Sequence, residues 1–410
     1  MQVDAPDLSP EFFQQHPMLM LVMLGFSLVV LAMLAGAVVS WIVLGIRYAQ
    51  GKSILPVAPW QARVWGLSDL MIVLILVVGS QFVALAIAVK SLGLPVRELG
   101  EDAGGSLPLS ALISLGYVCV VGVSTLWLVL RYGVSARHVG LGFAKLSSTW
   151  KVGVIGGIAA LPIVYLGNIL VSLGMKVEYA HPLLESMKSE PSVNGYLLAV
   201  FAAAIAAPLT EEFLFRGLLQ GWLQSIPFSS FPAVVLGASK SARTDPENTL
   251  FYQGKSFQGY VARTAGLSSG GRESQLADEK VGENEIIEAT LVGSEPKLTS
   301  NAAQPNPGNS PYEPPPLHGE GELEERNESG QEPLQGIPPI WPSLVAGTLF
   351  GLAHWGYGLS FIPLTVLGIF LGLIYRATQS VWPCIIIHFM LNSSSMIALG
   401  VMLLVENAGK

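Results

Sequence analysis

Two adjacent glutamates and an arginine interrupt an otherwise apolar stretch of the chain, in the segment 210–217 with the sequence TEEFLFRG. On a helix, side chains four residues apart share a face, so Glu212 and Arg216 can form an ion pair while Glu211 is turned about 100° away. Glu212 then has a structural role. Glu211 has no cation on its own face, and a desolvated carboxylate of this kind is suited to act as a general base. The alternative is one buried knot of all three charges that only fixes helix packing, although one glutamate would suffice for one arginine.

Two histidines occur with a second informative side chain one helical turn away. His354 follows Phe350 by four residues, and taken alone such a histidine is more often structural than catalytic. Asn392 follows His388 at the same spacing, so an imidazole and an amide should reach the same volume, where both can donate hydrogen bonds to a developing oxyanion. The alternative is that they only join helices, an interaction of about 0.6 kcal/mol on average in membranes.

These side chains together suggest one type of chemistry. A carboxylate, two imidazoles and an amide supply a water activator and an oxyanion donor, which is the minimum for amide hydrolysis without a covalent intermediate. They fall on three separate stretches that are otherwise almost free of polar groups. The sequence therefore predicts a hydrolytic site built from Glu211, His354, His388 and Asn392, supported by Glu212, Arg216 and Phe350.

The elements that must position these residues are membrane helices. Of the 410 residues, 51% are apolar and only 12% are charged, and several apolar runs exceed the roughly 20 residues that a helix needs to cross a bilayer. An ionisable side chain at that depth costs roughly 2.5–3.5 kcal/mol, so the few that occur need a reason. We expect an all-α, polytopic transmembrane helix bundle of about eight helices. The expected spans are Met18–Ile46, Leu67–Val89, Leu109–Leu130, Val152–Met175, Tyr196–Leu223, Pro342–Trp355, Phe361–Tyr375 and Val381–Val405, of which the sixth and seventh are short for a full crossing.

Basic residues in the loops predict the orientation of the bundle. Positive charges follow the first and the third span, so both loops should be cytoplasmic and the N-terminus should lie outside. The residues concerned are Arg47, Lys52 and Arg63 after the first span, and Arg131, Arg137, Lys145 and Lys151 after the third.

A long polar segment separates the first part of the expected site from the second. Residues 240–339 are poor in large apolar side chains, rich in Pro, Gly, Ser and Glu, and acidic, which predicts a disordered insertion. Just before it, Phe231–Gly237 is apolar but too short to span, and we expect an interfacial or re-entrant piece.

Glycines spaced four residues apart predict where helices approach closely. Such small-residue pairs allow close backbone contact in lipid, although glycine is also simply common in membrane helices. The pairs are Gly217 with Gly221, Gly347 with Gly351 and Gly368 with Gly372, and a looser cluster contains Gly153, Gly156 and Gly157.

The three motifs, in this order and on separate helices, resemble the CPBP family of CAAX-processing type II proteases and Abi-like bacteriocin-processing or self-immunity membrane proteins. The family pattern is Glu-Glu-x-x-x-Arg, then Phe-x-x-x-His, then His-x-x-x-Asn, and all of it is present here. The resemblance implies that Glu211 and His354 activate the attacking water, that His388 and Asn392 stabilise the oxyanion, and that Glu212 and Arg216 support Glu211. It also implies an intramembrane endopeptidase of a bacterial plasma (inner) membrane that cleaves near a substrate's C-terminus, as in CAAX-box protein processing, or in a membrane-bound peptide.

This resemblance divides the chain into four parts. Residues 151–239 and 340–405 form the two halves of the protease core, residues 240–339 are the insertion, and the helices of residues 1–150 serve as anchors. Many members of the family are described as metalloproteases, and Glu211, His354 and His388 are a plausible zinc ligand set. We favour a metal-free mechanism because these ligands are scattered, without a His-x-x-x-His pair on one helix.

Two other function classes remain open from the sequence. A non-catalytic membrane immunity or scaffold protein would use the polar cluster for packing and its acidic loop for partner binding. A transporter could use intramembrane Glu and His as a proton relay, but the two halves show no internal repeat or paired broken helices. The expected partners are membrane lipid and a peptide or protein substrate, which can be lipidated. A nucleic-acid role is excluded because there is no basic patch.

Overall fold

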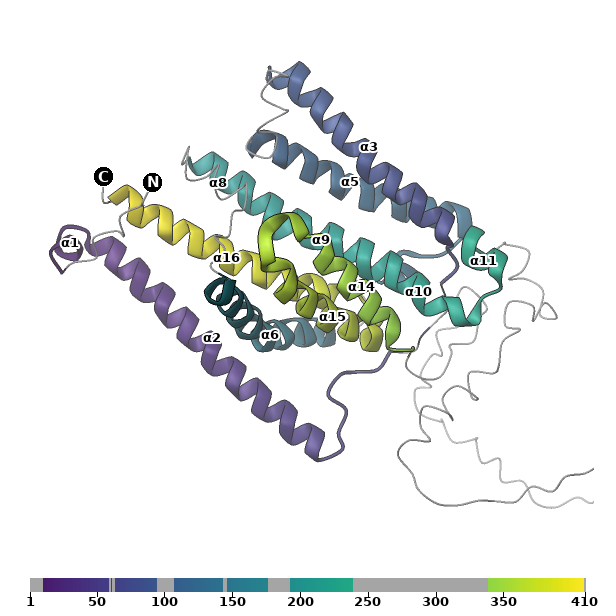
Figure 1. Cartoon of the computed structure of the whole chain (residues 1–410), viewed down its shortest axis with the longest axis horizontal. Helices are drawn as coiled ribbons and strands as arrows, with labels where there is room; N and C mark the ends of the chain where they lie inside the picture. Colours follow the sequence, from purple (N-terminus) through teal and green to yellow (C-terminus); the bar gives the residue numbers. More distant parts are fainter. Residues whose placement is uncertain are drawn as a thin grey trace, which may run out of the picture. The chain divides into compact units, whose positions relative to one another are not determined.

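The described part of the structure is a bundle of apolar helices (Figure 1). The computed structural model describes residues 10–58, 60, 63–93, 107–142, 146–175, 192–238 and 338–408. Within these residues there is no β-strand, and seven helices are long and apolar enough to cross a membrane. The predicted all-α polytopic bundle is therefore confirmed. The expected insertion lies outside the described residues, apart from Pro338 and Pro339.

The long helices follow the apolar runs of the sequence closely. They are α2 (Pro17–Ala49), α3 (Leu67–Leu92), α5 (Leu107–Tyr132), α6 (Leu146–Met175), α15 (Phe361–Thr378) and α16 (Trp382–Ala408), and the fifth membrane-length helix, Val193–Phe228, is composite. The short helices are α1 (Pro10–Gln15), η1 (Ala136–Val139), α11 (Phe231–Leu236), α14 (Trp341–Leu352) and η6 (Trp355–Ser360). The apolar piece expected at Phe231–Gly237 is thus a single short helix.

Two of the expected short helices differ from the prediction. α14 ends at Leu352, three residues before the expected end, and is the one short apolar helix of 10–17 residues in the described part of the chain. α15 continues to Thr378, so with the residues before it Gly358–Thr378 reaches a spanning length, contrary to our expectation. The last turn of α15 contains polar residues, so a prediction based on apolar runs ended the helix too early. In this last turn the Thr378 hydroxyl donates back to the Ile374 carbonyl at 2.9 Å, so its polar group is satisfied within the helix.

The fifth helix is continuous but not regular. It comprises α8 (Val193–Val200), the π-helical segment η2 (Phe201–Ala206), α9 (Ala207–Glu212), the π-helical segment η3 (Phe213–Gln220), α10 (Gly221–Ser225) and η4 (Ile226–Phe228). Pro208 lies in the first turn of α9, and a proline there lacks an N–H and clashes with the preceding turn of an α-helix. The wider π-helical turn before it accommodates this ring. Glu211 and Glu212 therefore lie on a six-residue α-helix between two π-helical segments, a type of irregularity that is frequent at functional sites.

Glycines set the closest helix contacts around the site. A Cβ placed on Gly347 of α14 would collide with the backbone of Gly368 and Ile369 on α15, and one on Gly372 would lie 3.0 Å from the Ser343 carbonyl. The predicted close approach is confirmed here. The cluster on α6 likewise lies against Ile386, Ile387 and Met390 of α16. The fifth helix differs, because Gly217 faces the Val139 carbonyl of η1 and Gly221 faces side chains.

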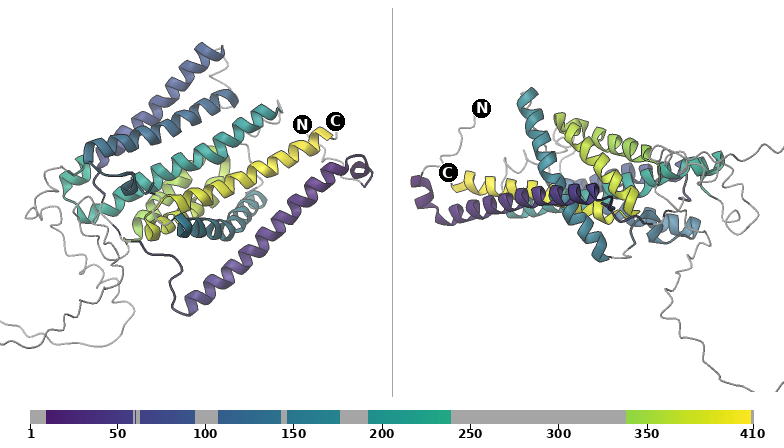
Figure 2. Two further views of the ribbon diagram at one scale, coloured as in Figure 1. Left: turned by 180° about the vertical axis from the view of Figure 1, so that it is seen from behind. Right: turned by 90° about the horizontal axis from the view of Figure 1, so that it is seen from below.

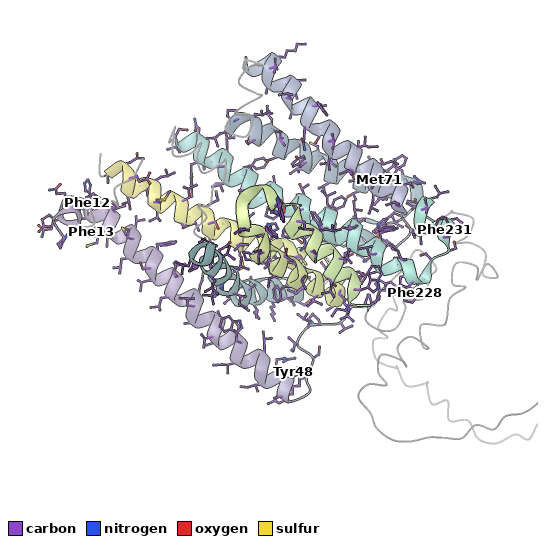
Figure 3. All side chains as sticks on the ribbon, in the orientation of Figure 1. Phe12, Phe13, Tyr48, Met71, Phe228 and Phe231 are labelled. Atoms are coloured by element: carbon purple, nitrogen blue, oxygen red, sulfur yellow. The ribbon has the colours of Figure 1, made fainter. Side chains whose placement is uncertain are left out.

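α16 is central in the arrangement of the helices. It packs against α6 on one side and against η2 and α9 on the other, while α14 packs on α15 (Figures 1 and 2). α3 packs against α5, and α2 packs against α6. Large apolar side chains project from the outer faces of these helices (Figure 3). Tyr48, Met71 and Phe231, labelled there, are 77%, 45% and 80% exposed, as expected for surfaces solvated by lipid.

Candidate active site

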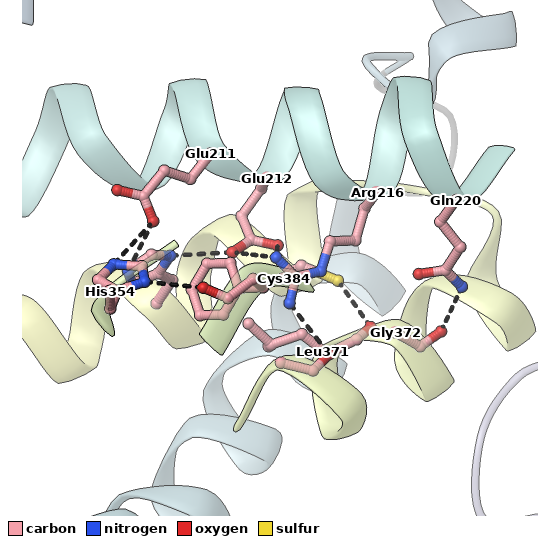
Figure 4. A network of polar contacts seen from close by, with 11 residues as sticks. Glu211, Glu212, Arg216, Gln220, His354, Leu371, Gly372 and Cys384 are labelled. Atoms are coloured by element: carbon pink, nitrogen blue, oxygen red, sulfur yellow. Dashed lines mark hydrogen bonds and ion pairs between the residues drawn. The ribbon is translucent and has the colours of Figure 1, made fainter. Parts of the chain in front are cut away.

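Three predicted site residues from two helices and a turn meet at one carboxylate oxygen. Glu211 comes from α9 and His354 from the turn after α14, and the two side chains point toward each other in Figure 4. His388 comes from α16. The Oε2 atom of Glu211 lies 3.6 Å from Nε2 of His354 and 4.0 Å from Nε2 of His388. The side chains of Glu211 and His354 are 26% and 19% exposed, so they are the accessible members of the cluster. His354 and His388 follow Glu211 by 143 and 177 residues in the sequence, and the fold brings the three side chains together.

Glu212 forms the buried foundation of this cluster. Its carboxylate lies 3.0 Å from Nη1 of Arg216, and both side chains are fully buried, which confirms the ion pair expected from their spacing. The same carboxylate accepts a hydrogen bond from Nδ1 of His388 at 2.9 Å. Arg216 also donates to the Gly368 carbonyl at 3.0 Å and lies over the ring of Phe350 at 4.4 Å. Each buried charge therefore has polar partners, as its burial requires.

The hydrogen bonds of the two histidines define which ring nitrogen faces Glu211. The carboxylate of Glu212 can only accept, so Nδ1 of His388 is the donor in that bond. Nδ1 of His354 donates to the Phe350 carbonyl at 2.8 Å for the same reason. Both Nε2 atoms are left facing Oε2 of Glu211, a buried atom that has no hydrogen-bond partner. A small donor such as water can bridge these acceptors.

His354 is positioned by the end of α14 rather than by a continuing helix. We expected it inside a helix that ended at Trp355, but α14 ends at Leu352 and His354 lies in the following turn. Its backbone N–H donates to the Gly351 carbonyl, which leaves the Phe350 carbonyl without a backbone donor. The imidazole takes that carbonyl, so the end of the helix fixes the ring.

Asn392 lies one turn from His388 but forms a different contact. Its amide donates to the Ala203 carbonyl of η2 at 2.7 Å, linking α16 to the π-helical segment. The other amide hydrogen is not used in that bond. The expected role of Asn392 at an oxyanion stays a prediction.

A comparison with known protein families matches the segments that carry these residues. A family model described as type II CAAX prenyl endopeptidase Rce1-like matches residues 193–239 and 323–394. The first matched segment contains Glu211, Glu212 and Arg216, and the second contains His354, His388 and Asn392. These matched segments are similar to the Rce1-like family, and we refer to them as the Rce1-like core. Searches of curated proteins and of solved structures gave no match.

Seven helices of membrane-spanning length in the described residues make this a multi-pass membrane protein, and the family that the Rce1-like core matches is one of endopeptidases. α2, α3, α5 and α6 precede the matched residues. Their expected role as anchors is not tested by the match.

The sequence did not lead us to predict the buried position of Gln220 in the Rce1-like core. Gln220 is fully buried one turn beyond Arg216, where its amide donates to the Gly372 carbonyl at 2.8 Å and to the Ser343 hydroxyl at 3.0 Å. The sequence did contain a signal for this buried residue. Polar residues recur at every fourth position of the apolar helix, at Glu212, Arg216, Gln220 and Gln224.

A zinc ion would find suitable donor types in the Rce1-like core but not a formed ligand set. Glutamate oxygen and imidazole nitrogen are both zinc ligands. However, among the described residues no group of three or more His, Cys, Asp or Glu side chains is arranged to hold a metal ion. The set Glu211, His354 and His388 does not fit as it stands, and we derive no catalytic step through a metal.

Proposed function

We propose that this chain is an intramembrane endopeptidase that hydrolyses a peptide bond of a membrane-bound substrate with a water molecule activated by Glu211 and His354. One observation carries this proposal: Oε2 of Glu211 is buried without a hydrogen-bond partner and faces Nε2 of two histidines. A water about 2.8 Å from Oε2 and from Nε2 of His354 would satisfy both acceptors.

The reaction needs one proton transfer in each direction. Glu211 takes a proton from the water as the oxygen attacks the substrate carbonyl carbon, and a tetrahedral oxyanion forms. Glu211 then gives the proton to the amide nitrogen as the C–N bond breaks, which releases an amine and a carboxylic acid that afterwards loses its proton to solvent. The acceptor Nε2 of His354 holds the second water hydrogen and so orients the attacking lone pair.

His388 is suited to stabilise the oxyanion when it is protonated. Its Nδ1 remains bonded to Glu212 at 2.9 Å, so an imidazolium would direct its Nε2–H toward the reacting carbonyl oxygen. The buried carboxylate of Glu212 supports that cation, and Arg216 keeps Glu212 itself paired. Asn392 adds a second donor one helical turn away, from the amide hydrogen that Ala203 does not use.

The family match supports a proposal for the substrate class. The Rce1-like description names a CAAX prenyl endopeptidase, so we propose that this chain removes the C-terminal residues of a lipidated peptide or protein held in the membrane. Lipid and this substrate are its partners, and the bacterial plasma membrane is its proposed location. Because the proposed mechanism uses no metal, a preparation free of bound metal by elemental analysis should keep full activity.

A substrate-trapping experiment tests the proposal. Glu211→Gln removes the base but preserves the size of the side chain, so the variant should retain intact membrane peptides that wild type converts to shorter products. The products should end in a new carboxyl group carrying one solvent oxygen. If wild type and Glu211→Gln retain the same uncleaved peptides, the chain binds without cleaving, and the scaffold function replaces the enzyme.

A further inference from the structure

A stripe of buried polar side chains leads away from the site along one face of the fifth helix. Glu212, Arg216, Gln220 and Gln224 follow one another at four-residue intervals, and all four are fully buried. An apolar helix in lipid has no need for two buried glutamines, because burying a polar side chain without partners costs free energy. We call these four residues the polar stripe.

Backbone carbonyls of α15 face the first part of the polar stripe. Arg216 donates to the Gly368 carbonyl at 3.0 Å. Gln220 donates to the Gly372 carbonyl at 2.8 Å (Figure 4). Gly368 and Gly372 lack side chains that would cover these carbonyls. The two helices therefore share a seam of polar atoms that begins beside the catalytic cluster.

Polar residues of a loop and of α15 lie beside Gly221, the residue that follows Gln220 of the polar stripe. A Cβ placed on Gly221 would lie 3.3 Å from Cγ of Arg63 and 3.3 Å from the hydroxyl of Tyr375. The guanidinium of Arg63 donates to the Tyr375 hydroxyl at 3.0 Å and to Oε1 of Gln379 at 2.9 Å. Arg63 belongs to the loop between α2 and α3, which the distribution of basic residues predicts to be cytoplasmic.

Polar atoms without partners are concentrated along this route. Both amide atoms of Gln224 are buried and have no hydrogen-bond partner, as are Oε1 of Gln220 and the Nε atoms of Arg63 and Arg216. Each such group costs about 1–3 kcal/mol when it is left unsatisfied. Buried polar groups in proteins that lack protein partners are usually bonded to water molecules.

We propose that the polar stripe is hydrated and carries water from the loop end of the bundle to Glu211. The hydrolysis proposed above consumes one water per peptide bond in a site surrounded by apolar helices, so the supply role rests on that function. Gln220 and Gln224 would each bind water with their free amide atoms, and Arg63 would bind the water nearest the loop. The π-helical segment η3 carries the middle of this route.

Radiolytic labelling of the wild-type protein tests the hydration. An X-ray pulse converts water to hydroxyl radicals, which oxidise side chains that touch that water. Tyr375 of α15 is fully buried, and its hydroxyl lies next to Gly221 and accepts a hydrogen bond from Arg63. Phe213 of the fifth helix is equally buried, but its ring carries no polar atom and packs among apolar side chains. Tyr375 should be oxidised and Phe213 should not. Mixing with H2¹⁸O just before the pulse should place ¹⁸O in Tyr375, which indicates exchange with bulk water.

Two outcomes of this experiment would overturn the proposal. If Tyr375 is protected from oxidation as fully as Phe213, the polar stripe contains no water. If Tyr375 is oxidised but carries only ¹⁶O, the water there does not exchange with bulk solvent and cannot supply the reaction. Neither result depends on peptidase activity, so the proposed function would stand.

A variant links hydration to turnover. Gln224→Leu removes both free amide atoms, so it should abolish the Tyr375 label and lower kcat with little change in KM. The matched control is Gln81→Leu, because Gln81 lies on α3 and is exposed outside the polar stripe. An unchanged kcat in Gln224→Leu with the label lost would refute the supply role while leaving the hydration intact.

Discussion

Nδ1 of His388 lies 2.9 Å from Oε1 of Glu212. This contact links the fully buried ion pair of Glu212 and Arg216 to the imidazole whose Nε2 faces Glu211. Two adjacent glutamates thus act on the same histidine from different sides. Glu212 fixes the ring through Nδ1, and Glu211 faces Nε2 at 4.0 Å. The neighbouring carboxylates therefore have separate roles, and their substitutions should have separable effects.

Substitution of Glu212 should damage the fold as well as the activity. Glu212→Gln leaves the guanidinium of Arg216 buried without its counter-ion, a change that typically costs about 3–5 kcal/mol. A large decrease in the midpoint of thermal unfolding in detergent should accompany the loss of hydrolysis. Full stability in Glu212→Gln would show that the ion pair does not hold this part of the bundle.

Substitution of His354 should lower turnover without unfolding the protein. His354→Gln removes the Nε2 acceptor that orients the water, so kcat should fall by about 10²–10⁴, the range typical of a positioned acid or base. The side chain is partly exposed, and its loss opens no large cavity. The kinetic comparison uses His16→Gln as a control, because His16 precedes α2 away from the site. Equal kcat values for the two variants would remove His354 from the mechanism.

The contact of α14 with α15 should depend on the absence of a side chain at Gly347. Gly347→Ala places a methyl group against the backbone of Gly368 and Ile369, and overpacking of this kind costs about 1–3 kcal/mol. Gly79→Ala is the matched control, because a Cβ there meets nothing within 4 Å and alanine is the better helix former. Thermal unfolding should therefore occur at lower temperature in the first variant and not in the second.

The insertion should be dispensable for hydrolysis. Ala238 donates its N–H to the Val64 carbonyl, and the Pro338 carbonyl accepts from Arg376. Arg63 and Arg376 both contact Gln379, so the two ends of the insertion attach to one connected set of residues. Replacing residues 240–336 with a short Gly/Ser linker should leave kcat within a small factor of wild type.

The control for the insertion is a linker variant that also carries Glu211→Gln. It should be folded and inactive. Complete loss of activity in a folded linker variant with intact Glu211 would favour the function in which the acidic loop is the working part.

Spacing within single helices predicted one ion pair and one place where two helices approach closely. The pair of Glu212 and Arg216 follows from four-residue periodicity, and the close approach at Gly347 and Gly368 follows from the lack of side chains. The joining of Glu211, His354 and His388 was expected from chemistry rather than from geometry, because no local rule links such distant residues.

The features that the sequence did not predict depend on tertiary packing. The π-helical turns around Glu211 have no simple residue signature, and the partner of Asn392 is a carbonyl on another helix. The end of α14 leaves a carbonyl at Phe350 that the ring of His354 takes, and helical periodicity does not encode this contact. Free amide atoms at Gln224 become visible only when its neighbours are placed.

Turnover of purified Glu211→Gln in lipid, measured against wild type and against Glu406→Gln, tests the central claim most directly. Glu406 lies near the end of α16, outside the site, and undergoes the same chemical change. We predict that Glu211→Gln unfolds at the wild-type temperature and cleaves no membrane-bound peptide, while Glu406→Gln cleaves it at the wild-type rate. Cleavage by folded Glu211→Gln at the rate of the control would contradict the role of Glu211 as the base.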